Sequence, residues 1–270
     1  MRKIFITLLL LPTLCLAHAS SVVYNSTNNT VISGSLDNQQ VSIASISKLL
    51  TVYTILKANQ NLDERLTVIN RHTPHTKLSR GMKLTRKELI EMSLISSDNL
   101  AAITLAENYP GGYSRFIRKM NDNADELNMR SSGFVEPTGL SPMNHSTIND
   151  LILLTNAVSA FDIVKTAAQT HQVITNPEVT IHKHKRKRKP MREPINRSIN
   201  KKLVNRPTST FFGKEGVITI KTGFTQAAGF CITMLVSSNN QLYNIVVLGA
   251  RTKQERQRII EKSLETIYNA

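Results

Sequence analysis

Three short motifs along the chain combine residue types that can perform nucleophilic catalysis. Ser45–Lys48 reads Ser-Ile-Ser-Lys, Ser97–Asn99 reads Ser-Asp-Asn and Lys221–Gly223 reads Lys-Thr-Gly. Singly they are weak signals, because Ser-x-x-Lys arises by chance about once in a chain of this length. Decoys occur at Ser198–Lys201 and Ser237–Asn239. Taken alone, each motif is better explained as a helix cap, a solvated lysine or a strand end. Their order and their local contexts favour one shared site.

The first motif has the spacing of a nucleophile and its base. A serine hydroxyl becomes reactive when a neighbouring base takes its proton. Lys48 follows Ser45 by three positions, and on a helix this spacing places both on one face, within reach of each other. A lysine acts as a base only when it is partly neutral, so burial or a nearby cation must lower its pKa. Lys221 could be that cation, and it could also bind a substrate carboxylate.

Backbone groups near the first and third motifs could stabilise an oxyanion. A helix that begins at Ser45 would present free N–H groups and a positive field there. A strand edge at Lys221–Phe224 could align a peptide substrate, and the N–H group of Phe224 would supply a second donor. Gly223 would let that substrate approach closely.

Apolar periodicity and turn residues predict the elements that position these motifs. A helix starts near Ser45 with an apolar face, and a break at 96–98 separates two further helices. Capping boxes are expected at 85–88 and 147–150, each leading into a helix. The remaining predictions are a hairpin of strands 21–24 and 30–33, helices over 99–108, 116–127, 151–158 and 253–268, and strands over 217–222, 229–237 and 241–250.

This order of elements predicts the fold class. Strands at both ends with helices between them indicate an α/β fold, in which the N- and C-terminal strands share one mostly antiparallel sheet. Helices flank this sheet and form a helical subdomain. No internal repeat is present.

Other catalytic classes are poorly supported. The chain lacks a Gly-x-Ser-x-Gly elbow, which argues against a Ser-His-Asp hydrolase. It also lacks a His-Glu-x-x-His motif, and the pairs His72/His75 and His182/His184 have no partner ligands nearby in sequence. We therefore interpret these histidines as surface residues and predict no metal site.

The N-terminus has the pattern of a secretory signal peptide over 1–19. Arg2 and Lys3 precede an apolar run, and Ala17-His18-Ala19 offers a small-x-small cleavage site. The alternative, a transmembrane anchor, is disfavoured because the run is short and interrupted. Cleavage after Ala19 would leave Cys231 as the one cysteine of the catalytic domain, 20–270, so no intramolecular disulfide could form. Export without disulfides fits a bacterial periplasm or cell surface.

The net charge is concentrated in one segment. The chain has 34 Lys and Arg against 19 Asp and Glu, a net charge of +15, which suggests an anionic partner such as nucleic acid. Loss of Arg2 and Lys3 leaves 32 against 19, or +13. The segment 182–206 carries eleven Lys and Arg and one Glu, so about +3 remains elsewhere. Apolar residues make up 40% of the chain, which excludes wholesale disorder.

The basic run Lys183–Lys189 has two interpretations. The simpler is a solvated, self-repelling insertion. The other is an attachment device that binds anionic envelope polymers or lipid headgroups. Nucleic acid is not expected as a partner, because an exported protein would meet little of it.

The motifs together resemble the low-molecular-mass penicillin-binding proteins, the D-alanyl-D-alanine carboxypeptidases and endopeptidases, which are serine-lysine DD-peptidases. The resemblance covers about Val22 to the end. It extends to the segments 44–49, 92–99, 134–140 and 221–229.

The resemblance implies a mechanism and the role of each residue. Ser45 would attack a D-alanyl peptide bond of peptidoglycan to form an acyl-enzyme, with Lys48 as base, and water would then hydrolyse it. Ser97 would relay a proton to the leaving amine, and Asn99 would bind the substrate backbone. Substrate and oxyanion would be held by Lys221, Thr222, Gly223 and Phe224. β-Lactams would acylate Ser45, and no cofactor is implied.

The resemblance also favours one branch of the family. Only about forty-seven residues follow Gly223, and Tyr109–Gly112 follows the second motif, as in the soluble endopeptidases that cut crosslinks. A carboxypeptidase remains the alternative, and a non-catalytic cationic wall-binding protein a minor one. A β-lactamase is disfavoured, since no Glu-x-x-Leu-Asn lies between the second and third motifs. Asp98 departs from the Glu expected in the endopeptidase branch.

Overall fold

The structure, a computed structural model, describes residues 19–69, 73–179 and 202–269. The predicted signal peptide lies outside these ranges apart from Ala19. The basic run Lys183–Lys189 also lies outside them. The elements, in chain order, are β1 Ser20–Asn25, β2 Thr30–Gly34, β3 Val41–Ser42, the 3₁₀ turn η1 Ala44–Ile46, α1 Ser47–Lys57, β4 Arg65–Thr67, β5 Met82–Thr85, α2 Arg86–Ile95, α3 Asn99–Glu107, α4 Gly112–Glu126, β6 His145–Ser146, α5 Ile148–Val158, α6 Asp162–Ala168, β7 Val173–Thr175, β8 Glu178–Val179, β9 Leu203–Asn205, β10 Val217–Thr225, β11 Gly229–Ser238, β12 Gln241–Ala250 and α7 Lys253–Tyr268.

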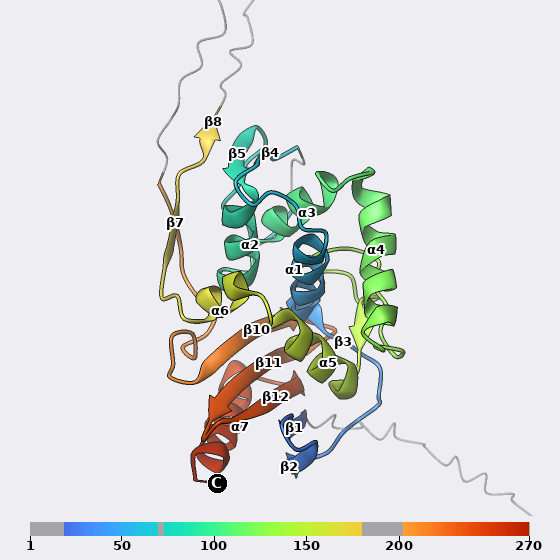
Figure 1. Cartoon of the computed structure of the whole chain (residues 1–270), viewed down its shortest axis with the longest axis vertical. Helices are drawn as coiled ribbons and strands as arrows, with labels where there is room; N and C mark the ends of the chain where they lie inside the picture. The colour runs from blue at the N-terminus through green and yellow to red at the C-terminus, as the bar shows by residue number, and fades with distance from the viewer. Residues whose placement is uncertain (1–18, 70–72, 180–201, 270) are drawn as a thin grey trace, which may run out of the picture.

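The main sheet joins the two ends of the described chain. Its strand order is β10-β11-β12-β1-β2, and every neighbouring pair is antiparallel. The N-terminal strand β1 pairs with the C-terminal strand β12, with Val22 opposite Val246 (Figure 1). This arrangement confirms the predicted sheet. It leaves β10, which carries the third motif, at one edge.

Helices cover the sheet and build a separate helical part. α7 packs against β11 and β12, while α5 contacts the same strands and α6 contacts β10 (Figure 1). α1 packs against α2, α3, α4 and α5, and the first three of these lie with it in the upper half of that view. The predicted α/β class with a helical subdomain is therefore confirmed. The 3₁₀ turn η1 contacts β10, and this contact joins the first motif to the third.

Helix α1 is more deeply buried than its sequence predicts. We expected one apolar face, but Thr51 and Thr54 are buried together with the leucines. The Thr51 hydroxyl donates to the carbonyl oxygen of Pro137 at 2.7 Å, and Thr54 accepts from the Asn123 amide at 3.1 Å. Hydrogen bonds to neighbouring elements thus allow polar side chains to pack inside the fold. The α-helix itself begins at Ser47, after the 3₁₀ turn.

The two predicted capping boxes differ in the structure. At the start of α2, Thr85 and Glu88 form the full reciprocal box. At the start of α5, the Thr147 side chain accepts from the N–H group of Asp150, but the Asp150 carboxylate accepts from the Ser131 N–H group and the Ser132 hydroxyl instead. The second box is therefore only half formed. Asp150 instead connects α5 to the segment before it.

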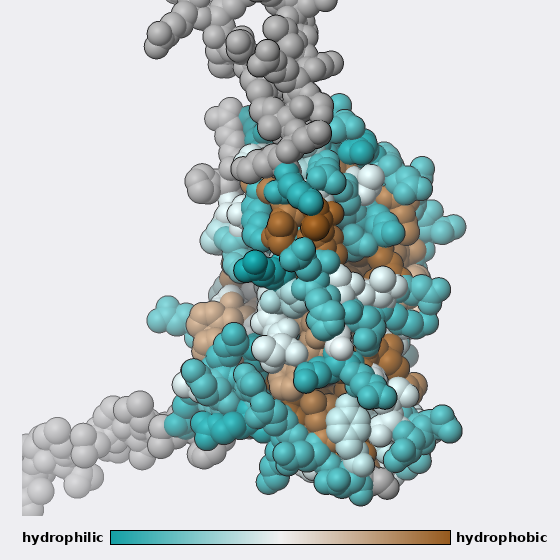
Figure 2. Space-filling view, turned by 90° about the vertical axis from the view of Figure 1, so that its left-hand side faces the viewer, coloured by the Kyte–Doolittle hydropathy of each residue, from teal (hydrophilic) through white to brown (hydrophobic). Residues whose placement is uncertain are grey.

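The sequence reading missed the short elements α6 and β3 to β9. Among them, β9 lies within the segment 182–206 that we expected to be an insertion, yet it pairs with β7, with Val204 opposite Ile174. Figure 2 shows the face at the left of Figure 1, which includes this region. Hydrophilic side chains predominate there, and apolar ones form small separate areas.

No single described helix is long and apolar enough to cross a membrane. Taken together, α5 and α6 have the length and the apolar composition of a membrane span, but the two helices are bent by 107° relative to each other.

Candidate active site

Ser45 and Lys48 lie in contact, as their spacing predicts. Ser45 occupies the 3₁₀ turn η1, and Lys48 lies in the first turn of α1. The Lys48 Nζ atom lies 2.9 Å from Ser45 Oγ. Lys48 is fully buried, whereas Ser45 lines an open cleft of about 380 Å³. The nucleophile is therefore reachable by a substrate while its base is shielded from water.

Two further contacts orient the Lys48 amine. Nζ donates to the Asn99 side-chain oxygen at 2.7 Å and to the Thr138 carbonyl oxygen at 2.8 Å. A neutral amine has two N–H groups and one lone pair. Nζ also donates to Ser45 Oγ when it is protonated. In the neutral amine, Asn99 and Thr138 would engage both N–H groups and leave the lone pair for Ser45 Oγ. This geometry is suited to removing the Ser45 proton.

Burial makes this amine a usable base. Desolvation lowers the pKa of Lys48 from 10.5 to about 7, against the smaller opposing effects of the Glu136 and Asp98 carboxylates. A group with a pKa near 7 is well suited to general base catalysis at neutral pH. The sequence predicted that either burial or a nearby cation, with Lys221 as the candidate, would lower this pKa, and in the structure burial is the cause.

Lys221 and Ser97 form the second pair of the site. Lys221 lies within β10 and is fully buried, and its Nζ atom donates to Ser97 Oγ at 2.9 Å and to the Thr222 carbonyl oxygen at 2.8 Å. Burial, with smaller contributions from the Lys48 and Arg256 charges, holds the pKa of Lys221 well below its usual value. Ser97 has a φ of +56°, a strained backbone conformation for serine that is typical of functional positions.

Asp98 and Asn99 connect the second motif to residues 74–77. The Asp98 carboxylate accepts from the Thr76 hydroxyl at 2.7 Å and from the N–H groups of Lys77 at 2.8 Å and Ala101 at 3.0 Å. It is therefore the N-cap of α3. The Asn99 side-chain amide donates to the Pro74 carbonyl oxygen at 2.8 Å. Both polar atoms of the Asn99 side chain thus have partners within the protein, including Lys48.

Gly223 lies against the backbone of the Ser45 turn. A Cβ atom on Gly223 would lie 2.8 Å from the Ile43 carbonyl oxygen and 3.0 Å from the Ser45 nitrogen. We expected this glycine to make room for the substrate, but in the structure it makes room for η1. The predicted oxyanion donors, the N–H groups of Ser45 and Phe224, are consequently on adjacent backbone segments.

Thr222 and Phe224 also line the cleft. The Thr222 hydroxyl donates to Thr208 Oγ1 at 2.6 Å, and Phe224 is 55% exposed. The structure therefore brings all eight predicted site residues to one region. Its cleft is lined by Ser45, Pro74, His75, Ser97, Asn99, Leu140, Thr208, Thr222, Gly223, Phe224, Phe230, Lys253 and Arg256.

The turn 136–141 carries the Thr138 carbonyl group, which accepts a hydrogen bond from Lys48. The sequence did not predict that this turn would position a catalytic side chain. The Glu136 carboxylate accepts from the N–H groups of Thr138 at 2.7 Å and Gly139 at 2.6 Å and from the Thr138 hydroxyl at 2.6 Å. These bonds hold the turn in place under Lys48. The sequence marked this segment only through its resemblance to a family.

Two cations of α7 also reach the cleft, and the sequence reading missed them. Arg256 is only 5% exposed; it donates to the Cys231 carbonyl oxygen at 3.2 Å, and its Nε atom is buried without a hydrogen-bond partner among the described residues. Lys253 is exposed beside it. An unpaired N–H group of a buried guanidinium is suited to an anion. No local motif could have identified these residues, since only the packing of α7 brings them to the cleft.

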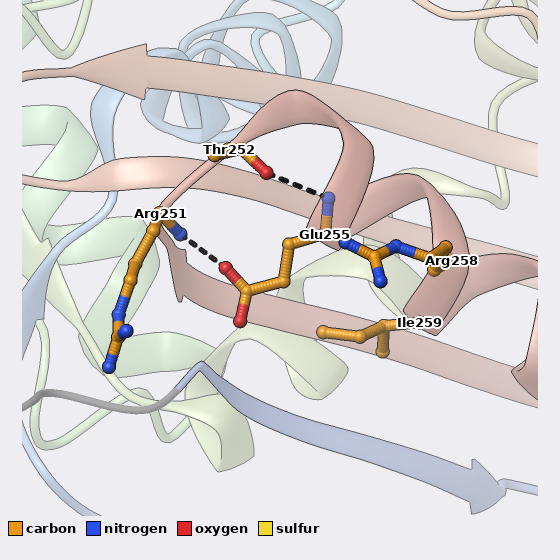
Figure 3. A pocket seen from close by; sticks show the side chains of 5 residues that line it. All are labelled: Arg251, Thr252, Glu255, Arg258 and Ile259. Carbon is orange, nitrogen blue, oxygen red and sulfur yellow. Dashed lines mark hydrogen bonds between the residues drawn. The ribbon is translucent and has the colours of Figure 1, made fainter.

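The first turn of α7 is fixed by hydrogen bonds on its other side. Thr252 accepts from the Glu255 N–H group at 3.0 Å, and the Glu255 carboxylate accepts from the Arg251 N–H group at 2.7 Å (Figure 3). Arg258 and Ile259 complete the lining of a second, separate hollow there. None of the eight predicted site residues lines this hollow, so the cleft at Ser45 is the candidate active site.

His75 is a surface residue, as predicted, and it also lines the cleft. It is exposed, its Nε2 atom lies 3.1 Å from the Ser96 carbonyl oxygen, and its own carbonyl oxygen accepts from the Asn99 N–H group at 3.2 Å. His72, His182 and His184 lie outside the described residues.

A serine on a turn that contacts an antiparallel sheet, with a buried lysine base in the helix that follows, defines the class of serine-lysine hydrolases. Comparison with known proteins gives the family. A model of the D-alanyl-D-alanine carboxypeptidases, peptidase family S11, matches residues 13–252, and the chain belongs to this family. It is therefore a serine-type hydrolase of the DD-peptidase family, and the predicted resemblance is confirmed.

Individual relatives support the assignment. The chain is 33% identical to a D-alanyl-D-alanine endopeptidase of Escherichia coli over 243 residues, which are 87% of this chain and 72% of the relative. Among solved structures, penicillin-binding protein D2 of Listeria monocytogenes with bound ampicillin has a TM-score of 0.74 at 25% identity, covering 91% of this chain and 95% of that one. The Streptomyces K15 DD-transpeptidase shares the fold, with a TM-score of 0.78 at 19% identity over 93% and 97% of the two chains.

Proposed function

We propose that this protein is a serine DD-endopeptidase that cleaves D-alanyl peptide crosslinks of peptidoglycan through an acyl-enzyme on Ser45. The observation that carries the proposal is the 2.9 Å contact between Ser45 Oγ and the buried Lys48 amine, whose pKa is lowered to about 7. The endopeptidase name of the Escherichia coli relative supports the choice of bond.

The reaction divides into acylation and deacylation. In acylation, Lys48 takes the proton of Ser45, and Ser45 Oγ attacks the D-alanyl carbonyl carbon. The N–H groups of Ser45 and Phe224 stabilise the oxyanion. The C–N bond then breaks as Ser97, in contact with Lys221, passes a proton to the leaving amine. In deacylation, water attacks the ester carbonyl carbon as Lys48 takes one of its protons. Lys48 passes this proton to Ser45 Oγ when the ester C–O bond breaks, and the D-alanyl carboxyl group is released.

The cations of the cleft provide a place for a substrate carboxylate. Lys253 and Arg256 line the same cleft as Thr222. A carboxylate next to the leaving nitrogen would be attracted to them. Asn99, whose side-chain atoms are engaged by Lys48 and Pro74, acts in this proposal mainly by holding Lys48 in place.

Fluorescent penicillin tests the acyl-enzyme. The ampicillin-bound relative supports the expectation that a β-lactam acylates this chain. We expect covalent labelling of the wild-type protein and its loss in Ser45→Ala. A third candidate function, a non-catalytic cationic wall-binding protein, requires that the wild type stay unlabelled.

Mass analysis of muropeptides tests the bond that is cleaved. Incubation with crosslinked dimers should convert them to monomers. The alternative function, a carboxypeptidase, is favoured by the same family assignment and predicts release of a terminal D-alanine from uncrosslinked pentapeptides. Release of D-alanine without conversion of dimers would support that alternative and refute the endopeptidase.

We further propose that the chain is exported through the signal peptide 1–19 and acts in the periplasm as a catalytic domain of residues 20–270. Cell fractionation tests this proposal: the protein should be found in the periplasmic fraction without residues 1–19. Recovery of the uncleaved chain from the cytoplasm would refute it.

Finally, we propose that the basic run Lys183–Lys189 attaches the enzyme to anionic wall polymers or to a membrane surface. Six of these seven residues are Lys or Arg. Each cation would contribute roughly 1 kcal/mol of binding free energy near an acidic surface. Deleting Lys183–Lys189 should release the protein from washed sacculi or anionic vesicles at low salt. Unchanged retention would refute the proposal. Retention of the wild-type protein measured at increasing salt concentration serves as the control for charge.

A further inference from the structure

A stacked pair of aromatic rings forms part of the cleft. Phe224 and Phe230 have ring centroids 4.1 Å apart and an interplanar angle of 27°, and both line the cleft with Ser45. Phe224 is 55% exposed, although large apolar side chains are usually buried. The mechanism uses only the backbone N–H group of Phe224, so the exposed ring has no role in it.

Strand geometry places this pair on the same side of β10 as Thr222. Side chains alternate between the faces of a strand, so Lys221 and Gly223 share the face towards Ser97 and the Ser45 turn. Thr222 and Phe224 share the other face, and Phe230 lies directly opposite Phe224 on β11. Two residues along a strand span about 7 Å. The aromatic pair is therefore about that far from the carboxylate site at Thr222 and Arg256.

A third apolar group reaches the cleft from another part of the fold. Leu140 is 42% exposed and also lines the cleft with Ser45. It follows Gly139 in the turn that the Glu136 carboxylate holds. Apolar side chains from this turn and from a strand pair thus line one cleft together with polar groups that perform the reaction.

We propose that Phe224, Phe230 and Leu140 form an apolar subsite for the aliphatic chain of the diamino acid on the leaving side of a crosslink. The proposal rests on the endopeptidase function and identifies the residues that select the crosslink. A diamino acid that carries a carboxylate on the carbon of its leaving amine continues beyond that carbon as an aliphatic chain, close in length to the roughly four-carbon stem of lysine. With its carboxylate near Arg256, such a stem would reach the aromatic pair about 7 Å away and cover it. A terminal D-alanine has only a methyl group and would leave the rings exposed.

Phe230→Ala tests the subsite, because Phe230 lines the cleft and stacks on Phe224 but takes no part in the catalytic steps. Three rates are to be measured: kcat/KM for a crosslinked dimer, kcat/KM for an uncrosslinked pentapeptide and the rate of acylation by penicillin. We expect a loss of about tenfold for the dimer and less than about twofold for the other two rates. Phe230→Leu should restore most of the dimer rate.

A matched control separates the subsite from general effects of apolar surface. Leu242 on β12 is 38% exposed and does not line the cleft, so Leu242→Ala should leave all three rates unchanged. Equal losses on dimer and pentapeptide in Phe230→Ala, or an unchanged dimer rate, would overturn the subsite while leaving the proposed function intact. Failure of the wild type to cleave dimers would instead overturn the proposed function and the subsite with it.

Discussion

Gly139 lies directly on the carbonyl group of Ala44, the residue before the nucleophile. A Cβ atom on Gly139 would lie 1.8 Å from the Ala44 oxygen, and Gly139 has a φ of +80°. Ala44 itself has a φ of +47°. Two unusual backbone conformations thus meet where the turn held by Glu136 supports the turn that carries Ser45.

This contact predicts that Gly139→Ala displaces the nucleophile. Part of the effect comes from the positive φ, which costs alanine about 1–2 kcal/mol, and the larger part from the steric clash. We expect a lower melting temperature and a penicillin acylation rate reduced by at least about tenfold. Gly112→Ala is the matched control, because Gly112 has a φ of +77° but open space at its Cβ position. Equal acylation by the two variants would contradict the prediction.

The lowered pKa of Lys48 predicts the pH dependence of acylation. Because burial lowers the pKa of Lys48 to about 7, the amine is neutral above this pH and can take the Ser45 proton. Below it, the protonated amine has no lone pair, and the acylation rate should fall about tenfold per pH unit. Stopped-flow acylation by a chromogenic β-lactam between pH 5 and 9 measures this limb, with circular dichroism as the control for folding. A flat profile would argue against Lys48 as the base.

The Glu136 carboxylate predicts the direction in which this limb can be shifted. The negative charge of Glu136 raises the pKa of Lys48, and so does that of Asp98. The neighbouring cation is Lys221, whose own pKa is lowered by the charge of Lys48. Glu136→Gln removes the charge and should move the acid limb to lower pH. It should also reduce the maximal rate, because one amide oxygen cannot accept all the bonds from Thr138 and Gly139. Glu265→Gln, on the exposed side of α7, is the control that should leave the limb in place.

The two carboxylate oxygens of Asp98 have different hydrogen-bond partners, so different substitutions of Asp98 should lower the stability by different amounts. Asp98→Ala removes the N-cap of α3 and the bonds to Thr76 and Lys77, which should cost about 1–3 kcal/mol of unfolding free energy. Asp98→Asn keeps an oxygen for Thr76 and Ala101 and should lose less. Urea denaturation of the three proteins tests this order. Identical midpoints would show that these bonds contribute nothing to stability.

Ser97 and Lys221 predict a defect in proton transfer. Ser97→Ala removes the hydroxyl that lies 2.9 Å from the Lys221 amine, so proton delivery to the leaving amine should slow. We expect peptide cleavage to fall by about 10²-fold or more, with Ser45 still labelled by penicillin over long incubation. Ser96→Ala, one residue earlier and outside the cleft lining, should retain most activity. Full peptide cleavage by Ser97→Ala would remove Ser97 from the mechanism.

The sequence alone determined which residues belong to the site and which long elements carry them. The Ser45–Lys48 spacing fixes a local geometry that a single helical turn can realise, and apolar periodicity predicts α1, α7 and the strands β10 to β12. These are short-range properties, so neighbouring residues suffice to read them. The resemblance to a family also marked the segment around Glu136, although its part in the geometry was not foreseen.

Tertiary structure decided what depends on residues far apart in the chain. Thr51 and Thr54 on α1 can be buried because they form hydrogen bonds with Pro137 and Asn123. The helix therefore does not have the exposed polar face that its sequence predicts. Arg256 reaches the cleft only because α7 packs against β11. The lowered pKa of Lys48 likewise requires that Asn99 and the turn at Thr138 enclose it. Desolvation and long-range packing are sums over the whole fold, and no local pattern in a sequence contains them.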